Sequence, residues 1–158
     1  MKSLKLFIGT GFGSGMAPVA PGTIGSLVAT IALYFVLMVD PYLGPVIFMI
    51  AAGLLTLWVG KTCEEEWGKD PGKVVIDEFS GQAVVFISIP LFNEPTLDAL
   101  LMGVGFLLFR IFDIWKPLGI RKVQKTGGGL GILLDDLIAG LYALICLKTL
   151  IFFASKIV

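Results

Sequence analysis

Residues 132–154 read ILLDDLIAGLYALICLKTLIFFA, and this run decides the fold class of the chain. It is long enough to cross a bilayer, because a helix needs about 20 residues to span the hydrocarbon core. Two adjacent acids, Asp135 and Asp136, lie inside the run near its beginning. The run therefore predicts a membrane-spanning helix that carries a polar site near one end.

Four further apolar segments precede this run, at 23–39, 44–60, 79–91 and 97–112. They lack the period-two alternation of strands, and a backbone that faces lipid must satisfy its own hydrogen bonds, so helices are favoured. The third segment has only 13 residues and is expected to begin earlier or to enter the membrane without crossing it. Of all residues 56% are hydrophobic and only 15% are charged, whereas soluble domains have about 25% charged residues. We therefore expect an all-α, multi-spanning bundle of about five apolar helices, formed as one domain by residues 1–158.

The charged residues gather in three segments, 1–23, 61–78 and 110–131. These segments hold ten of the twelve Lys and Arg residues, and the loops at 40–44 and 90–96 hold none. Basic residues mark the cytoplasmic side of a multi-spanning protein. We therefore expect the polar chemistry of the chain to lie at the cytoplasmic face of a membrane.

Several classes of protein are excluded by residue type. The chain has no His, which rules out a Ser–His–Asp triad, His-ligated zinc and a phosphohistidine intermediate. Its two Cys residues form no CxxC pair, and Cys63 is followed by EEEWG rather than by a phosphate-binding loop. A formal net charge of zero argues against a nucleic-acid binder.

A glycine-rich stretch, GTGFGSG at residues 9–15, is followed by Thr23 and Ser26. Alternating glycines allow positive φ and close approach to a ligand, and successive N–H groups in such a turn can hold an anion. A flexible loop at the membrane surface is an equally good interpretation. Thr23 is predicted to be the N-cap of the first membrane helix, with the positive end of that helix at the same boundary.

Two groups of charged residues lie where a polar loop meets an apolar segment. Asp77 and Glu78 open the third segment; they either serve as ordinary helix-start acids or face a partner close to the hydrocarbon. Arg110, Asp113 and Lys116 follow one another at i,i+3 spacing, so they share a helix face. They form either an ion-paired helix end or a carboxylate flanked by phosphate-binding cations.

A third group follows the glycine-rich turn at 127–131, where Asp135 and Asp136 enter the last helix. Adjacent helical residues point about 100° apart, so at most one of the two is expected to face a ligand squarely.

The bundle topology brings five carboxylates to the same depth: Asp77, Glu78, Asp113, Asp135 and Asp136. Left alone they would repel one another and resist desolvation, so they require protonation or a cation. Oxygen ligands without His or a suitable Cys favour Mg²⁺ over Zn²⁺. Nearby cations at Arg110, Lys116, Arg121 and Lys122 would attract a phosphate. A metal-dependent phosphoryl reaction at the lipid–water boundary uses all of these features.

Four motifs carry a resemblance to a known family: GTGFGSG with APGTIGS, VIDEFSG at 75–81, FRIFDIWKP with IR at 109–121, and GGLGILLDDLIAG at 128–140. Together and in this order they resemble the phosphatidylglycerophosphatase A family. The resemblance implies Mg²⁺-dependent removal of the terminal phosphate from phosphatidylglycerophosphate, which yields phosphatidylglycerol during phospholipid biosynthesis.

The resemblance also implies roles for individual residues. The expected catalytic residues are Asp77, Glu78, Asp113, Asp135 and Asp136. The expected metal ligands are Asp77, Glu78, Asp113 and Asp136. The expected substrate-binding residues are Arg110, Lys116, Arg121, Thr23, Ser26, Gly128 and Gly129.

The mechanism stays open between water attack on phosphorus assisted by Mg²⁺ and attack by a carboxylate to form an aspartyl-phosphate. A small membrane transporter for cations or protons is the main alternative function. It would place charges near mid-membrane, with access from both sides. A non-catalytic protein that binds anionic lipid headgroups through its basic loops is a second alternative.

Overall fold

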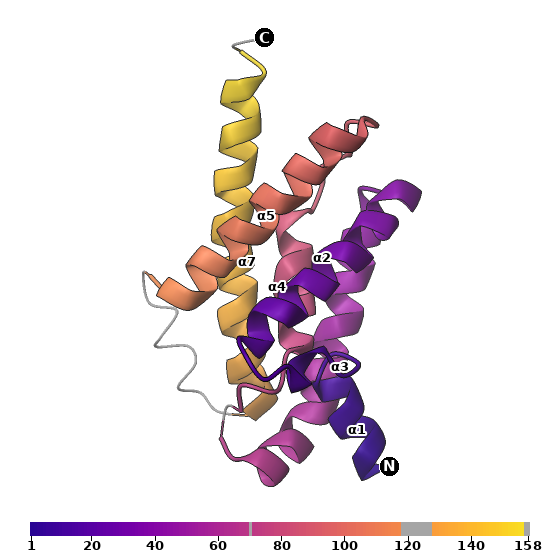
Figure 1. The fold of residues 1–158 in the computed structure, drawn as a ribbon, viewed down its shortest axis with the longest axis vertical. Helices are drawn as coiled ribbons and strands as arrows, with labels where there is room; N and C mark the ends of the chain where they lie inside the picture. Colours follow the sequence, from indigo (N-terminus) through magenta and orange to yellow (C-terminus); the bar gives the residue numbers. More distant parts are fainter. Residues whose placement is uncertain (70, 118–127, 157–158) are drawn as a thin grey trace.

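The computed structural model describes residues 1–69, 71–117 and 128–156, and these residues form an all-helical bundle (Figure 1). The helices are α1 (Lys2–Gly9), the 3₁₀ turn η1 (Ser14–Met16), α2 (Pro21–Val39), α3 (Leu43–Trp67), α4 (Ile76–Val85), α5 (Pro95–Trp115) and α7 (Gly128–Ala154). The predicted all-α class is therefore confirmed. The five predicted apolar segments correspond to α2, α3, α4, α5 and α7, whereas α1 was not predicted.

Within the described chain, three helices are long and apolar enough to cross a membrane: α2, α3 and the part of α7 from Leu130 to Ala154. These three helices suggest a membrane protein. Helix α5 has 21 residues but contains Asp98, Arg110 and Asp113. Helix α4 has only 10 residues, so it is about 15 Å long and reaches across only half of a hydrocarbon core.

The short helix α4 forms the centre of the bundle. All ten of its residues are buried, and it packs against α2, α3, α5 and α7. Figure 1 shows α3 and α7 flanking α4 while α2 and α5 cross it obliquely. The acids at the start of α4 are thereby enclosed by the four longer helices.

Two glycines allow the backbones of α4 and α7 to touch. A Cβ on Gly140 would lie 2.3 Å from the carbonyl oxygen of Gly81, and a Cβ on Gly81 would lie 2.7 Å from the carbonyl oxygen of Asp136. Small residues at a crossing let membrane helices approach closely. This contact fixes the beginning of α4 beside the acidic turn of α7.

The glycine-rich stretch 9–15 is packed rather than loose. The backbone N–H of Val75 donates to the carbonyl of Gly9 at 3.0 Å. A Cβ on Gly15 would lie only 2.2 Å from the carbonyl oxygen of Lys73. Gly11 has φ 54°, a left-handed conformation that favours glycine. The stretch therefore supports the loop that leads into α4.

The sequence prediction that Thr23 caps the first membrane helix is wrong. Helix α2 begins at Pro21, and Ala20 is its N-cap. Proline is well suited to the first helical turn, because its missing N–H would have had no intrahelical partner there. Thr23 therefore lies inside the first turn of α2.

Acidic side chains cap the turns at the other end of the bundle. The side chain of Asp40 accepts hydrogen bonds from the backbone N–H groups of Tyr42 (2.8 Å) and Leu43 (3.0 Å). The side chain of Glu94 caps α5 by accepting from the N–H of Leu97 at 2.7 Å.

We predict that Gly140→Ala destabilises the protein by about 1–3 kcal/mol, because the added methyl overpacks the α4–α7 crossing. Thermal unfolding in detergent measures the effect as a lower Tm. Gly103→Ala on α5 is the matched control, since a Cβ there meets nothing within 4 Å in the described structure. The control should keep or raise the Tm, and a Gly140→Ala variant as stable as wild type would contradict the packing argument.

Candidate functional site

A polar cavity of about 420 Å³ opens at the end of the bundle where α2 and α4 begin and α5 ends, beside the second and third turns of α7. All five predicted carboxylates line it, together with two of the predicted cations and Thr23. These lining residues are Asp77, Glu78, Asp113, Asp135, Asp136, Arg110, Lys116 and Thr23. The structure thus brings together groups that are up to 113 positions apart in the sequence.

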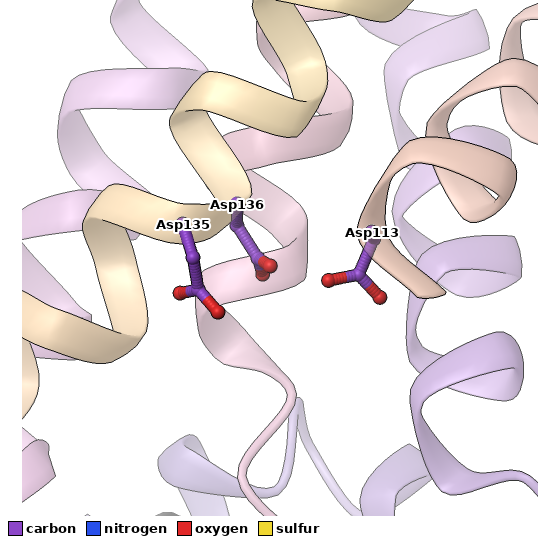
Figure 2. Close-up of side chains that lie close together, drawn as sticks. All are labelled: Asp113, Asp135 and Asp136. Atoms are coloured by element: carbon purple, nitrogen blue, oxygen red, sulfur yellow. The ribbon is translucent and has the colours of Figure 1, made fainter. Parts of the chain in front are cut away.

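Three of the carboxylates form a compact cluster. Asp113, Asp135 and Asp136 each offer one oxygen, and these oxygens lie within 4.8 Å of one another. Figure 2 shows Asp135 and Asp136 on α7 reaching toward Asp113 on α5. The 100° spacing of adjacent helical residues predicts that only one of the pair faces a ligand squarely. Both nevertheless offer an oxygen to this cluster, because Asp113 approaches from a neighbouring helix.

Glu78 and Arg110 form a buried ion pair beside this cluster. Their side chains are 10% and 12% exposed, respectively. The hydroxyl of Ser26 donates to Glu78, and Arg110 also donates to the Ser26 oxygen at 3.1 Å. Arg110 reaches Asp113 as well, at 2.9 Å. Arg110 thus joins the start of α4 to the acidic cluster.

Ser26 does not lie where a substrate-binding residue was expected. It is completely buried and is not among the residues that line the cavity. Its hydroxyl contacts Glu78 and Arg110 instead. Its observed contacts fit a supporting position rather than direct contact with a ligand.

Lys116 lies at the end of α5 and connects its own helix to α7. Its ammonium group pairs with Asp135 and lies 4.0 Å from Asp113. Burial disfavours the charged form, but the hydrogen bond to Asp135 and the charges of Asp135 and Asp113 raise the pKa of Lys116 above its ordinary value. Lys116 therefore remains a cation at the rim of the acidic cluster.

Two oxygens in the cavity point to a missing partner. Asp77 Oδ1 and Asp136 Oδ2 are buried, and neither has a hydrogen-bond partner among the described residues. A buried polar atom without a partner is costly, and such atoms commonly mark a water or ion site. Asp77 and Asp136 belong to the two helices that touch at the Gly81–Gly140 crossing.

The formal charges of the described lining residues do not balance. Five carboxylates face only two cations, Arg110 and Lys116, which leaves an excess of three negative charges if all of the acids are ionised. An all-oxygen set of this kind suits Mg²⁺, which prefers carboxylate and phosphate oxygens. The residues present therefore fit a divalent cation.

The first turn of α2 forms one wall of the cavity through Pro21, Gly22 and Thr23. The first N–H groups of a helix have no intrahelical partner and favour anions. A Cβ at Gly22 would lie 2.3 Å from Glu78 Oε1, so a larger residue here would displace the Glu78 carboxylate. The sequence pattern did not identify this role, which depends on contact with a residue 56 positions away.

The structure says less about the remaining predicted site residues. Arg121 and Lys122 lie outside the described residues. Gly128 is the first residue of α7 and Gly129 the second; their surroundings also lie outside what the structure describes. Asp135, predicted as catalytic but not as a metal ligand, has an oxygen in the acidic cluster.

The chain is similar to several known proteins. Residues 7–151 match the family described as phosphatidylglycerophosphatase A. A Bacteroides thetaiotaomicron protein, provisionally named a phosphatidylinositol-3-phosphatase, is 44% identical over 151 residues, which cover 90% of each chain.

Two further relatives are named phosphatidylglycerophosphatase A. The Escherichia coli protein is 34% identical, with 84% of this chain and 75% of the relative covered. The Haemophilus influenzae protein is 38% identical, with 87% and 83% covered. No solved structure matches the chain.

We predict that Arg110→Leu lowers the free energy of unfolding by about 3–5 kcal/mol, because it leaves Glu78 buried without its partner charge. The double variant Arg110→Leu, Glu78→Leu should recover much of this loss, since it removes both charges. Denaturation in detergent measures both. If the double variant is no more stable than Arg110→Leu alone, the ion pair is not the cause.

Proposed function

The chain belongs to the phosphatidylglycerophosphatase A family, and we propose that it removes the terminal phosphate of phosphatidylglycerophosphate with Mg²⁺ as cofactor. As a family member it is a phosphatase that hydrolyses a phosphate monoester. The observation that carries the more specific proposal is the cluster of Asp113, Asp135 and Asp136 inside a cavity that also contains Arg110 and Lys116.

The acidic cluster would hold the metal. Asp113, Asp135 and Asp136 supply the oxygens, and Asp77 adds a buried carboxylate to the same cavity. Bound Mg²⁺ would neutralise charge on the phosphate oxygens and lower the pKa of a water molecule. This set differs from the ligands implied by the resemblance, because Glu78 is held by Arg110 and Ser26.

The cations and the start of α2 would hold the phosphate. Arg110 and Lys116 lie beside the cluster and stay positioned through their ion pairs with Glu78, Asp113 and Asp135. The first residues of α2 line the same space, and the N–H groups of a helix start favour an anion. The phosphate group would thus lie between the acidic cluster and the α2 terminus.

In the reaction, a bond forms between phosphorus and an attacking oxygen, and the bond between phosphorus and the glycerol oxygen breaks. Water then supplies the proton of the released hydroxyl, so the products are phosphatidylglycerol and inorganic phosphate. The attacking oxygen belongs either to water, which gives inorganic phosphate directly, or to a carboxylate such as Asp77, whose buried Oδ1 lacks a hydrogen-bond partner in the described chain. In the second case the phosphoryl group is first bonded to the carboxylate, and a water molecule then hydrolyses this aspartyl-phosphate, which frees the carboxylate and releases inorganic phosphate.

The location proposed for this chemistry is the cytoplasmic face of a bacterial inner membrane. The cavity lies at the end of the bundle that bears residues 1–23, 61–69, 71–78 and 110–117, which include seven of the twelve Lys and Arg residues. This one-sided arrangement also disfavours the transporter alternative, since the charged lining residues gather at a single end.

A phosphoinositide is the second candidate substrate. The relative that shares 44% identity and is covered over 90% of its length is provisionally named a phosphatidylinositol-3-phosphatase. Both candidates carry a phosphate monoester on a lipid headgroup, so the same cavity could serve either. A comparison of kcat/KM on the two lipids distinguishes the two candidate substrates.

We predict that the purified protein in detergent releases phosphate from phosphatidylglycerophosphate with Mg²⁺, and that EDTA abolishes the release. Phosphatidylinositol 3-phosphate is assayed in parallel, and the larger kcat/KM identifies the preferred lipid. Release that is indifferent to EDTA would overturn the metal proposal. Absence of release from both lipids would overturn the proposed substrates.

Asparagine variants test the acidic residues. Asp77→Asn, Asp113→Asn and Asp136→Asn should each lower kcat by about 10²-fold or more, because electrostatic stabilisation of the transition state is lost. Asp98→Asn is the matched control: Asp98 is buried on α5 outside the cavity, and asparagine can still accept the hydrogen bond from the N–H of Phe92. A cavity variant that retains the wild-type rate has no part in the reaction.

A further inference from the structure

An apolar groove runs between α2 and α5 on the outside of the bundle, with a volume of about 410 Å³. On α2 it is lined by Leu27, Ile31 and Phe35, and on α5 by Met102, Gly103 and Phe106. The three α2 side chains are between 43% and 61% exposed, so the groove opens toward the surroundings of the bundle.

The groove continues the polar cavity along the same two helix faces. Leu27 follows Thr23 of the cavity by four residues on α2, and Phe106 precedes Arg110 of the cavity by four residues on α5. Residues four apart lie one above the other on a helix. Figure 1 shows that the start of α2 and the end of α5 lie at the same end of the bundle. Along both helices the lining therefore changes from the charged cavity to the apolar groove in the same direction.

The dimensions of the groove suit a hydrocarbon chain. From Thr23 to Phe35 the helix rises about 18 Å, and one leaflet of a bilayer core is about 15 Å thick. A lipid whose phosphate lies in the cavity would therefore have room for an extended acyl chain beside it. The charged lining of the cavity gives way to the apolar lining of the groove at the level where the acyl chain of such a lipid would begin.

Gly103 opens the groove at its middle. A Cβ at this position would meet nothing within 4 Å in the described structure. Gly105, two residues further on, faces the core instead, and a Cβ there would lie 2.5 Å from the ring of Phe86. Packing within the described protein therefore accounts for Gly105 but not for Gly103, whereas a chain lying in the groove would account for Gly103.

A second groove near the site has a poorer connection to it. Phe112 and Trp115 of α5 line it together with Tyr142 and Ile145 of α7. Phe112 and Trp115 lie on a different face of α5 from the stripe formed by Arg110, Phe106 and Gly103. This second groove therefore serves as the control position.

We propose that the α2–α5 groove is the subsite for an acyl chain of the lipid substrate. The proposal rests on the proposed function, because it places the lipid phosphate in the polar cavity. The subsite makes the enzyme selective for substrates with long chains, since the groove extends well past the level of Gly103. Short-chain substrates would use the cavity alone.

The test compares wild type with Gly103→Trp on two forms of phosphatidylglycerophosphate, dioleoyl and dihexanoyl, in mixed micelles with Mg²⁺. The indole should fill the groove and lower kcat/KM for the dioleoyl lipid by about tenfold or more, as expected for altered fit in an apolar pocket. The fall should appear chiefly in KM, and kcat/KM for the dihexanoyl lipid should be unchanged. Ile145→Trp, which lies outside the α2–α5 groove, should behave as wild type on both lipids.

Each outcome is decisive. Equal losses on both lipids would show that Gly103→Trp damages the fold or the chemistry, and unchanged activity on the dioleoyl lipid would show that the groove is not used. Either result overturns the acyl subsite. If wild type hydrolyses neither lipid, the proposed function fails first and the subsite fails with it. Loss of long-chain preference in Ile145→Trp instead would place the chain between α5 and α7 and overturn the proposal.

Discussion

The backbone contact between α4 and α7 is the constraint on which the rest of the structure depends. At Gly81 and Gly140 the two helices approach so closely that a single methyl group would collide with a carbonyl oxygen. Helix–helix association in lipid relies on such close packing, because lipid is as apolar as the side chains and hydrophobic burial drives it little. The contact places Asp77 and Glu78 of α4 beside Asp135 and Asp136 of α7, so the acidic site is a direct consequence of the glycine crossing.

Burying these acids carries a large electrostatic penalty, which the surrounding residues offset only in part. Arg110 and Lys116 join three helices through ion pairs, and removing either would leave a buried charge exposed to repulsion. The excess negative charge of the described lining residues therefore favours the binding of a further cation. Apolar residues in place of these acids would raise the free energy of unfolding. The presence of acids at buried positions is therefore itself an argument for function.

The sequence predicted those features that depend on local pattern. Apolar runs located the long helices, and the change from polar loop to apolar run located all five acids of the cavity. Features that depend on contact between distant segments were missed or misjudged. Thr23 has the residue type of an N-cap, yet Pro21 two positions earlier starts the helix. The glycines at 9–15 allowed an anion loop or a mobile loop, whereas their close approach to the loop at 73–75 decides that they pack.

The positive ends of helices help to explain why the acids gather at this end of the bundle. These helix ends do not offset all of the negative charge. Helices α2 and α4 begin at the cavity, and each N-terminus contributes roughly half of a positive charge. Two such ends offset about one of the three excess negative charges on the described lining residues. The negative charge that remains is close in magnitude to the charge of one divalent ion. This supports a bound metal ion rather than neutralisation by helix dipoles alone. The same positive helix ends would then face a phosphate, so one arrangement of helices serves both the acids and the anion that they act upon.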